Sequence, residues 1–211
     1  APVIYLIGML LCILSLFMLV PAIVDWFYGS NDWPAFIASS LVTVFFGGAF
    51  YLSGRGSATE HLELRQAFLL TNSAWLSIAL FGSLPFLFSE INMSFVDAIF
   101  ESTSGITTTG STVIVNLEQT SHGILIWRAL LQWLGGIGII VMALAILPML
   151  SIGGMQLFKT ESYETPDKVV PKAASFAKGI SIVYVTLTIT WAVMLWGAGM
   201  PVFDSIAHAM T

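Results

Sequence analysis

Residues 94–112 read SFVDAIFESTSGITTTGST, a short amphipathic segment followed by threonine, glycine and serine. The apolar residues at positions 95, 96, 99 and 100 recur with helical spacing, which predicts a helix from Ser94 to Gly105. A helix of that length measures ~18 Å, about half of what a bilayer requires. The segment can therefore enter a membrane but cannot cross it.

The composition of the whole chain is that of a membrane protein. Of its 211 residues, 57% are hydrophobic and only 9% are charged, and the mean hydropathy is +0.90. Soluble globular domains carry about 25% charged residues, so a soluble fold is excluded. The net charge of −5 also argues against nucleic acid as a partner, because nucleic-acid binding needs clustered Lys and Arg.

Five uncharged runs are each longer than the roughly 18 residues that mark a transmembrane helix. The first run has no basic start, so we interpret it as a span rather than as a signal peptide. The sequence thus predicts an all-α integral membrane protein with spans at Ala1–Val24, Trp33–Gly54, Gln66–Ser89, Ala129–Phe158 and Gly179–Phe203.

The connecting segments 55–65 and 159–178 contain every basic residue except Arg128. By the positive-inside rule, both segments face the cytoplasm, and the N-terminus lies on the same side. Residues 90–128 must then begin and end outside, so the short helix enters the membrane and the chain returns to the side it came from. Irregular backbone at that depth is stable only where protein or a water-filled path solvates it.

Two features of the connecting segments leave alternatives open. Most acidic residues lie in segments predicted to be outside, where they would concentrate cations; alternatively, acids simply avoid the cytoplasmic loops. The segment 159–178 mixes both charges with Pro166 and Pro171. It is either a solvated linker or part of a docking surface for a regulatory partner.

The residues after the short helix can form an ion filter. A helix that ends inside the membrane turns the negative end of its dipole toward the centre, which favours a cation. A row of backbone carbonyls, together with threonine hydroxyls, can replace the hydration shell of that ion. Gly110 can freely adopt the backbone angles that turn the carbonyls to one side. We expect the filter at Thr108, Thr109, Gly110 and Ser111; the alternative is an ordinary polar extracellular loop.

Three further residues are candidates for supporting the filter or attracting cations: Glu101, Asp97 and Thr107. Asp97 and Glu101 lie four residues apart on one helix face, where like charges are mildly destabilising. Asp97 is also near the helix start, where the positive end of the dipole favours a carboxylate. We favour this explanation for Asp97 and leave the role of Glu101 open.

The sequence contains the beginning of a repeat. MSFVDAI at 93–99 is echoed by MPVFDSI at 200–206, and each copy follows an uncharged span. The chain therefore holds one unit of span, half-helix, filter and span at 66–158, and a second unit starts at 179–211 and stops within its half-helix. One filter strand cannot surround an ion. We expect this chain to be part of a longer protein, with further strands supplied by more repeats or by other chains.

Several motifs spread over most of the chain resemble the TrkH branch of the Trk/Ktr/HKT potassium-transporter superfamily. They are LPF at 84–86, DAIFES at 97–102, TTTG at 107–110, LQWLGGIGI at 131–139, AILP at 145–148 and GGMQL at 153–157. Residues 108–112 also resemble the TVGYG filter of potassium channels, without its second glycine and its tyrosine.

The resemblance implies four membrane–pore–membrane repeats around one cation path, as in potassium channels, preceded by a two-helix hairpin at 1–54. It maps the filter glycine to Gly110 and the potassium-coordinating residues to Thr108 and Thr109, mainly through their carbonyls. It further implies potassium uptake across a bacterial cytoplasmic membrane. The partners it implies are a second copy in a homodimer, membrane lipid and a cytoplasmic nucleotide-binding regulator of the TrkA type.

Other function classes remain as alternatives. A cation-coupled secondary transporter could use a re-entrant broken helix, although such carriers are often built from inverted repeats, whereas this repeat is direct. An enzyme is the weakest possibility, since the sequence contains neither an HExxH nor a GxSxG pattern. We therefore expect no enzymatic activity and no cofactor other than the potassium ion itself.

Overall fold

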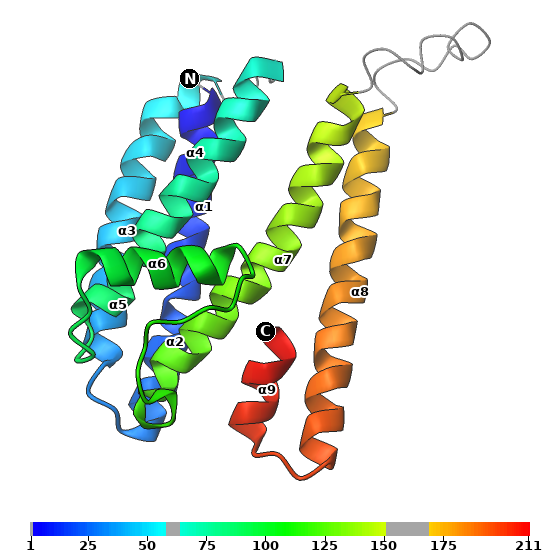
Figure 1. Cartoon of the computed structure of the whole chain (residues 1–211). Helices are drawn as coiled ribbons and strands as arrows, with labels where there is room; N and C mark the ends of the chain where they lie inside the picture. Colours follow the sequence, from blue (N-terminus) through cyan, green and yellow to red (C-terminus); the bar gives the residue numbers. More distant parts are fainter. Residues whose placement is uncertain (1, 58–63, 151–168) are drawn as a thin grey trace, which may run out of the picture. The chain divides into compact units, whose positions relative to one another are not determined.

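The computed structural model describes residues 2–57, 64–150 and 169–211, and every regular element in these residues is helical (Figure 1). The chain divides into two compact units, Ala1–Gly135 with Met210–Thr211, and Gly136–Ala209. Much of the predicted segments 55–65 and 159–178 lies outside the described residues, as does the predicted span end at Phe158.

Five helices in the described residues are long and apolar enough to cross a membrane. They are Pro2–Tyr28, Trp33–Gly54, Arg65–Phe88, His122–Ile140 and Lys178–Gly197. Each overlaps one of the five predicted spans, so hydropathy alone located them. Their ends differ from the prediction mainly where a charged side chain lies inside a helix.

The first unit begins with a helical hairpin. Its first arm is α1 (Pro2–Phe17) followed by α2 (Leu19–Tyr28), and its second arm is α3 (Trp33–Gly54). The arms approach closely because glycines lie at the contact: Gly8 faces the backbone of Tyr51 and Gly54 faces Tyr5. Without a hydrophobic driving force between helices in lipid, this close backbone packing is what holds the hairpin together.

The half-helix lies beside the hairpin. After a short 3-10 turn (η1, Arg55–Ser57), α4 (Leu64–Gly82) and α5 (Leu84–Phe88) lead to α6 (Phe95–Ile106). In Figure 1, α6 lies across the direction of α1, α3 and α4, and it packs against α4 and α5. The predicted half-helix thus exists, shifted by one residue, because Ser94 is its N-cap.

A second 3-10 turn (η2, Leu117–Gln119) precedes α7 (His122–Leu150). The prediction that this span starts at Ala129 is wrong, because α7 begins at His122. The uncharged run in the sequence begins only after Arg128. In the structure, however, this arginine lies within the helix, and its charge is paired with Glu101. A paired charge can be accommodated inside a membrane helix, and a search for uncharged runs cannot detect the pairing.

The second unit contains the rest of α7, α8 (Val169–Gly197) and most of α9 (Val202–Met210). Helix α8 begins at Val169, earlier than the predicted span start at Gly179. A short helix, α9, follows α8 at the position of the sequence echo, and Asp204 lies in its first turn as Asp97 lies in that of α6.

Gly8→Ala should destabilise the hairpin by about 1–3 kcal/mol, because the added methyl group would overlap the Tyr51 backbone. Gly48→Ala is the matched control: nothing lies within 4 Å of its Cβ position, and alanine is up to about 1 kcal/mol better than glycine within a helix. Thermal unfolding in detergent measures both. Equal effects from the two variants would contradict the close contact.

Candidate functional site

The start of α6 is fixed by a capping interaction. The Ser94 hydroxyl accepts a hydrogen bond from the Asp97 amide at 3.2 Å and donates one to Asp97 Oδ2 at 2.7 Å. This reciprocal pair satisfies a backbone donor that the first turn of a helix otherwise leaves free. In the structure, Asp97 therefore serves the beginning of α6, at the opposite end from the filter segment.

The end of α6 turns sharply. Thr108 has φ 58° and Gly110 has φ 76°, both in the left-handed region. The amides of Thr108 and Thr109 donate back to the carbonyls of Gly105 and Ser104, each at 2.9 Å. Left-handed backbone is easy for Gly110, but at the β-branched Thr108 it costs about 1–3 kcal/mol. Such strain is concentrated at functional sites, where the surrounding structure enforces it.

This turn leaves a row of carbonyl oxygens uncovered. In the described part of the chain, no hydrogen bond ends on the carbonyl oxygens of residues 107–110, and all four residues are exposed. Ser111 differs, since its carbonyl accepts a hydrogen bond from Ser104 Oγ at 2.6 Å and is thereby directed toward α6. Unpaired carbonyls at the negative end of a helix dipole can donate oxygens to a cation, so these residues form a candidate oxygen-donor site.

The threonine hydroxyls extend the oxygen-donor site. Thr107 Oγ1 donates to the carbonyl of Thr103 at 2.7 Å, and it lies 2.8 Å from Thr109 Oγ1. Because the single hydroxyl hydrogen of Thr107 is used on Thr103, the Thr109 hydroxyl must donate to Thr107. Lone pairs of Thr109 Oγ1 then remain available to a cation.

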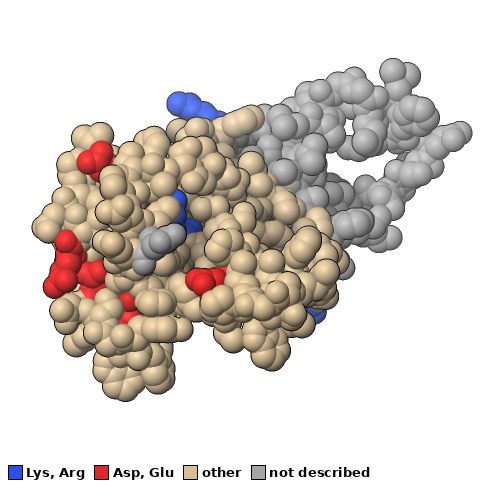
Figure 2. All heavy atoms as spheres, turned by 60° about the horizontal axis from the view of Figure 1, so that its bottom comes forward, with Lys and Arg blue, Asp and Glu red and all other residues tan. Residues whose placement is uncertain are grey.

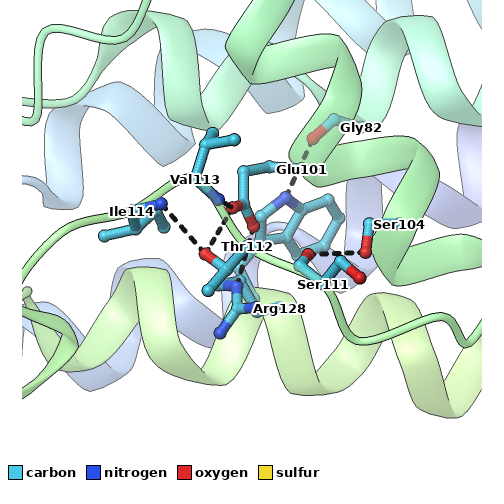
Figure 3. A network of polar contacts seen from close by, with 9 residues as sticks. Gly82, Glu101, Ser104, Ser111, Thr112, Val113, Ile114 and Arg128 are labelled. Carbon is cyan, nitrogen blue, oxygen red and sulfur yellow. Dashed lines mark hydrogen bonds and ion pairs between the residues drawn. The ribbon is translucent and has the colours of Figure 1, made fainter.

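A buried carboxylate holds the filter segment against α6 and α7 (Figure 3). One oxygen of Glu101 accepts hydrogen bonds from the Thr112 hydroxyl and, at 2.6 Å, from the Val113 amide. The other oxygen pairs with Arg128 Nε at 2.9 Å. The Glu101 side chain is fully buried and that of Arg128 is 14% exposed, so the pair is shielded from solvent.

Helix α7 supports the other side of α6. Any side chain at Gly135 would overlap the carbonyl of Ile106, and Leu131 packs directly on Gly105. Trp127 Nε1 donates to the carbonyl of Gly82 at 3.0 Å, which also ties α7 to the end of α4. The C-terminal end of α6, and with it the filter segment, is therefore held by α7 through contacts at backbone distance.

The predicted acidic outer surface is smaller than the sequence suggests. Asp25, Asp32 and Glu101 are 0%, 6% and 1% exposed, so these three acids contribute no exposed charge to that surface. One oxygen of Asp25 and one of Asp32 accept backbone amides, and Glu101 pairs with Arg128, while Asp25 Oδ2 is buried without a hydrogen-bond partner among the described residues. Glu90 remains exposed. Figure 2 accordingly shows a largely uncharged face, with acidic atoms in a few separate places.

Sequence reasoning missed two partners in this site. The sequence predicts that Arg128, at the border of an apolar run, extends to the membrane surface or binds Glu118, whereas the structure pairs it with Glu101. A usable signal was present, because a lone base among apolar residues needs an acid, and Glu101 is the one acid of the half-helix that does not lie in its first turn. The bond from Ser104 to Ser111 had no such signal.

Comparison with known proteins identifies the family. Residues 33–211 match the TrkH family, described as "Cation transport protein". The chain belongs to the TrkH family. The family match confirms the resemblance noted in the sequence and the prediction that the chain is a transport protein rather than an enzyme.

Two curated TrkH-family relatives illustrate the similarity. The Trk system potassium uptake protein TrkH of Salmonella typhimurium is 41% identical over 209 residues, which cover 98% of this chain and 43% of the relative. The protein of the same name from Vibrio parahaemolyticus is 42% identical over 212 residues, which cover 99% and 44%. The chain therefore spans less than half the length of these relatives.

A solved TrkH structure confirms the fold. The crystal structure of the potassium transporter TrkH from Vibrio parahaemolyticus matches with a TM-score of 0.86 at 40% identity, covering 99% of this chain and 42% of that one. The all-α, multi-pass membrane fold predicted from the sequence is thus confirmed.

Glu101→Ala and Arg128→Ala should each lower the free energy of unfolding by about 3–5 kcal/mol, because each leaves an unpaired buried charge. The double variant should lose less than the sum of the two, since one interaction is removed in both. Glu90→Ala, at an exposed acid, is the control and should change stability by less than about 0.5 kcal/mol. Strictly additive losses, measured by denaturation in detergent, would contradict the coupling.

Proposed function

We propose that this chain contributes one filter strand to a pore for potassium uptake. The observation that carries the proposal is the row of uncovered carbonyl oxygens at residues 107–110, immediately after the C-terminal end of the half-helix α6. The names of the relatives, which are potassium uptake proteins of the Trk system, support potassium as the ion.

Within this strand, the carbonyls of Thr108, Thr109 and Gly110 are the proposed ion ligands. The hydroxyl of Thr109 adds a further oxygen. A dehydrated monovalent cation is stabilised by such oxygens when their number and spacing replace its hydration shell. Ser111 stays a predicted ligand, with its carbonyl shared with Ser104.

The residues around the strand set its geometry. Glu101 holds the strand beyond the filter, and Thr107 orients the hydroxyl of Thr109. Asp97 secures the opposite end of α6. Because all of these contacts are internal, the carbonyls are pre-oriented before an ion arrives, which limits the reorganisation that ion binding requires.

The proposed orientation follows the positive-inside rule. The N-terminus and the segments 55–65 and 159–178 face the cytoplasm, and the filter entrance faces outside a bacterial cytoplasmic membrane. The C-terminal end of α6 lies next to the proposed filter residues, so the negative end of its dipole adds to the attraction for a cation entering from outside.

A complete pore needs further components. A single strand presents oxygens to one side of an ion only, so other repeats or other chains must supply the remaining strands. We further propose a homodimer in contact with membrane lipid and gating by a cytoplasmic nucleotide-binding regulator of the TrkA type. The term "Trk system" in the relatives' names is consistent with a multi-component transporter.

Flux measurements test the mode of transport. In the complete protein, reconstituted in vesicles, a pore should carry potassium down its gradient without a coupling ion, at rates well above those of a carrier. The direct sequence echo and the short helix α9 support this mode, since carriers with broken helices are often built from inverted repeats. Flux that stops when a proton or sodium gradient is removed would instead indicate a coupled transporter.

Gly110→Ser tests the filter itself. The nearest atom to its Cβ position is Gln132 Oε1 at 3.9 Å, so the serine fits sterically but is strained at φ 76°. We expect the carbonyl row to distort and permeability to broaden toward sodium. Permeability ratios can be measured by uptake in cells that lack other potassium uptake systems.

Gly199→Ser is the matched control for this experiment. Gly199 also has a positive φ, of 101°, and open space around it, but it lies in the turn between α8 and α9. Both serines carry a similar backbone strain, and only the one at position 110 should alter ion preference. An unchanged preference for potassium over sodium in Gly110→Ser would overturn the filter assignment.

A further inference from the structure

The hairpin binds the first repeat through two carboxylates near the turn that joins its arms, Asp25 in α2 and Asp32 at the N-cap of α3. Asp25 Oδ1 accepts a hydrogen bond from the amide of Gly123 at 2.5 Å. Asp32 Oδ1 accepts one from the amide of Glu90 at 2.8 Å. Both acids are buried, so these charge-assisted bonds are shielded from water and are stronger than exposed ones.

The contact between Asp25 and Gly123 is closely fitted. Gly123 lies in the first turn of α7, where free amides and the positive end of the dipole favour a carboxylate. Any side chain at this position would overlap Asp25 and crowd Phe36, so only glycine fits. The ring of Tyr28 also stacks on that of His122, with centroids 3.9 Å apart. The hairpin therefore fixes the beginning of α7.

The two contacts lie on either side of the filter in the sequence. Glu90 precedes α6, whereas Gly123 follows the filter strand. Between them lie only the half-helix, the filter and the strand that leads to α7. A segment held at both ends has fewer alternative conformations, so the hairpin restricts the whole re-entrant segment.

The beginning of α7 is also connected directly to the filter. Arg128 lies little more than one helical turn after Gly123 and pairs with Glu101. Glu101 in turn binds Val113 at the end of the filter strand. A shift of α7 at Gly123 would therefore move Arg128 and loosen the carboxylate that holds this strand.

We propose that Asp25 and Asp32 are positioning residues for the filter, so that the hairpin contributes to ion selectivity although it contains no filter residue. This inference rests on the proposed function, since it concerns the same filter. It assigns the hairpin a task beyond anchoring the chain in the membrane.

The principal test removes the contact between Asp25 and Gly123 by substituting each of the two residues in turn. Asp25→Ala and Gly123→Ala in the complete protein should each lower the potassium-to-sodium permeability ratio roughly tenfold, the lower end of what losing an outer-shell partner of an ion site costs. The double variant should be no worse than the single ones, because both remove one contact. Asp25→Asn keeps an acceptor for the Gly123 amide and should retain most of the preference.

Controls separate positioning from general stability. Gly48→Ala, in the same hairpin but with open space around it, should leave the ratio unchanged. Hydrogen exchange at the Gly123 amide should accelerate in Asp25→Ala, and exchange at the Glu90 amide should accelerate in Asp32→Ala. These measurements need no transport activity, so they remain informative if a variant transports poorly.

The outcomes distinguish this inference from the proposed function. If Gly110→Ser alters selectivity but Asp25→Ala and Gly123→Ala do not, the filter stands and the positioning role is overturned. A lower yield of folded Asp25→Ala protein with an unchanged potassium-to-sodium permeability ratio would likewise show that Asp25 is only a structural residue. If Gly110→Ser has no effect on selectivity, the proposed function itself fails, whatever the hairpin variants do.

Discussion

The first repeat depends on one buried carboxylate. Both oxygens of Glu101 are occupied, one by Arg128 and the other by the filter strand at Thr112 and Val113. A buried ion pair offsets its desolvation cost only when further hydrogen bonds satisfy its remaining lone pairs, and the bonds from Thr112 and Val113 to Glu101 do so. Because Glu101 lies in α6 and its partners lie in α7 and in the segment between the two helices, this one side chain determines how those segments lie relative to one another.

The strained backbone of the proposed filter is stabilised by hydrogen bonds at both of its ends. At one end, the amides of Thr108 and Thr109 return to carbonyls of α6; at the other, Glu101 and Ser104 hold the strand. A left-handed threonine between such anchors keeps a conformation that it would leave in a free peptide. The carbonyls are thus left uncovered because the ends of the segment are fixed, and these are the oxygens that we propose as ion ligands.

Two acidic residues of the hairpin act as buried hydrogen-bond acceptors for the first repeat. Asp25 and Asp32 look like surface charges in the sequence, yet each is buried and accepts a backbone amide from a distant segment. In a chain with few charges, each buried carboxylate that satisfies a backbone donor replaces a hydrogen bond to water. Small residues complement them: Gly123 leaves room for the side chains of Asp25 and Phe36, and Gly135 lets α7 approach the backbone of Ile106.

The sequence alone determined the membrane fold, the spans and the half-helix, since hydropathy, length and helical spacing are local properties that each segment carries by itself. It also singled out the Thr-Gly segment that we propose as the filter, because threonine and glycine next to a half-helix suit only a few chemistries. Tertiary structure alone decided the start of α7, the pairing of Arg128 with Glu101, and the burial of Asp25 and Asp32. These are contacts between residues far apart in the chain, and no local pattern records which acid meets which base or amide. Whether a charge ends a helix or lies within one depends on that partner, so only the folded chain could settle it.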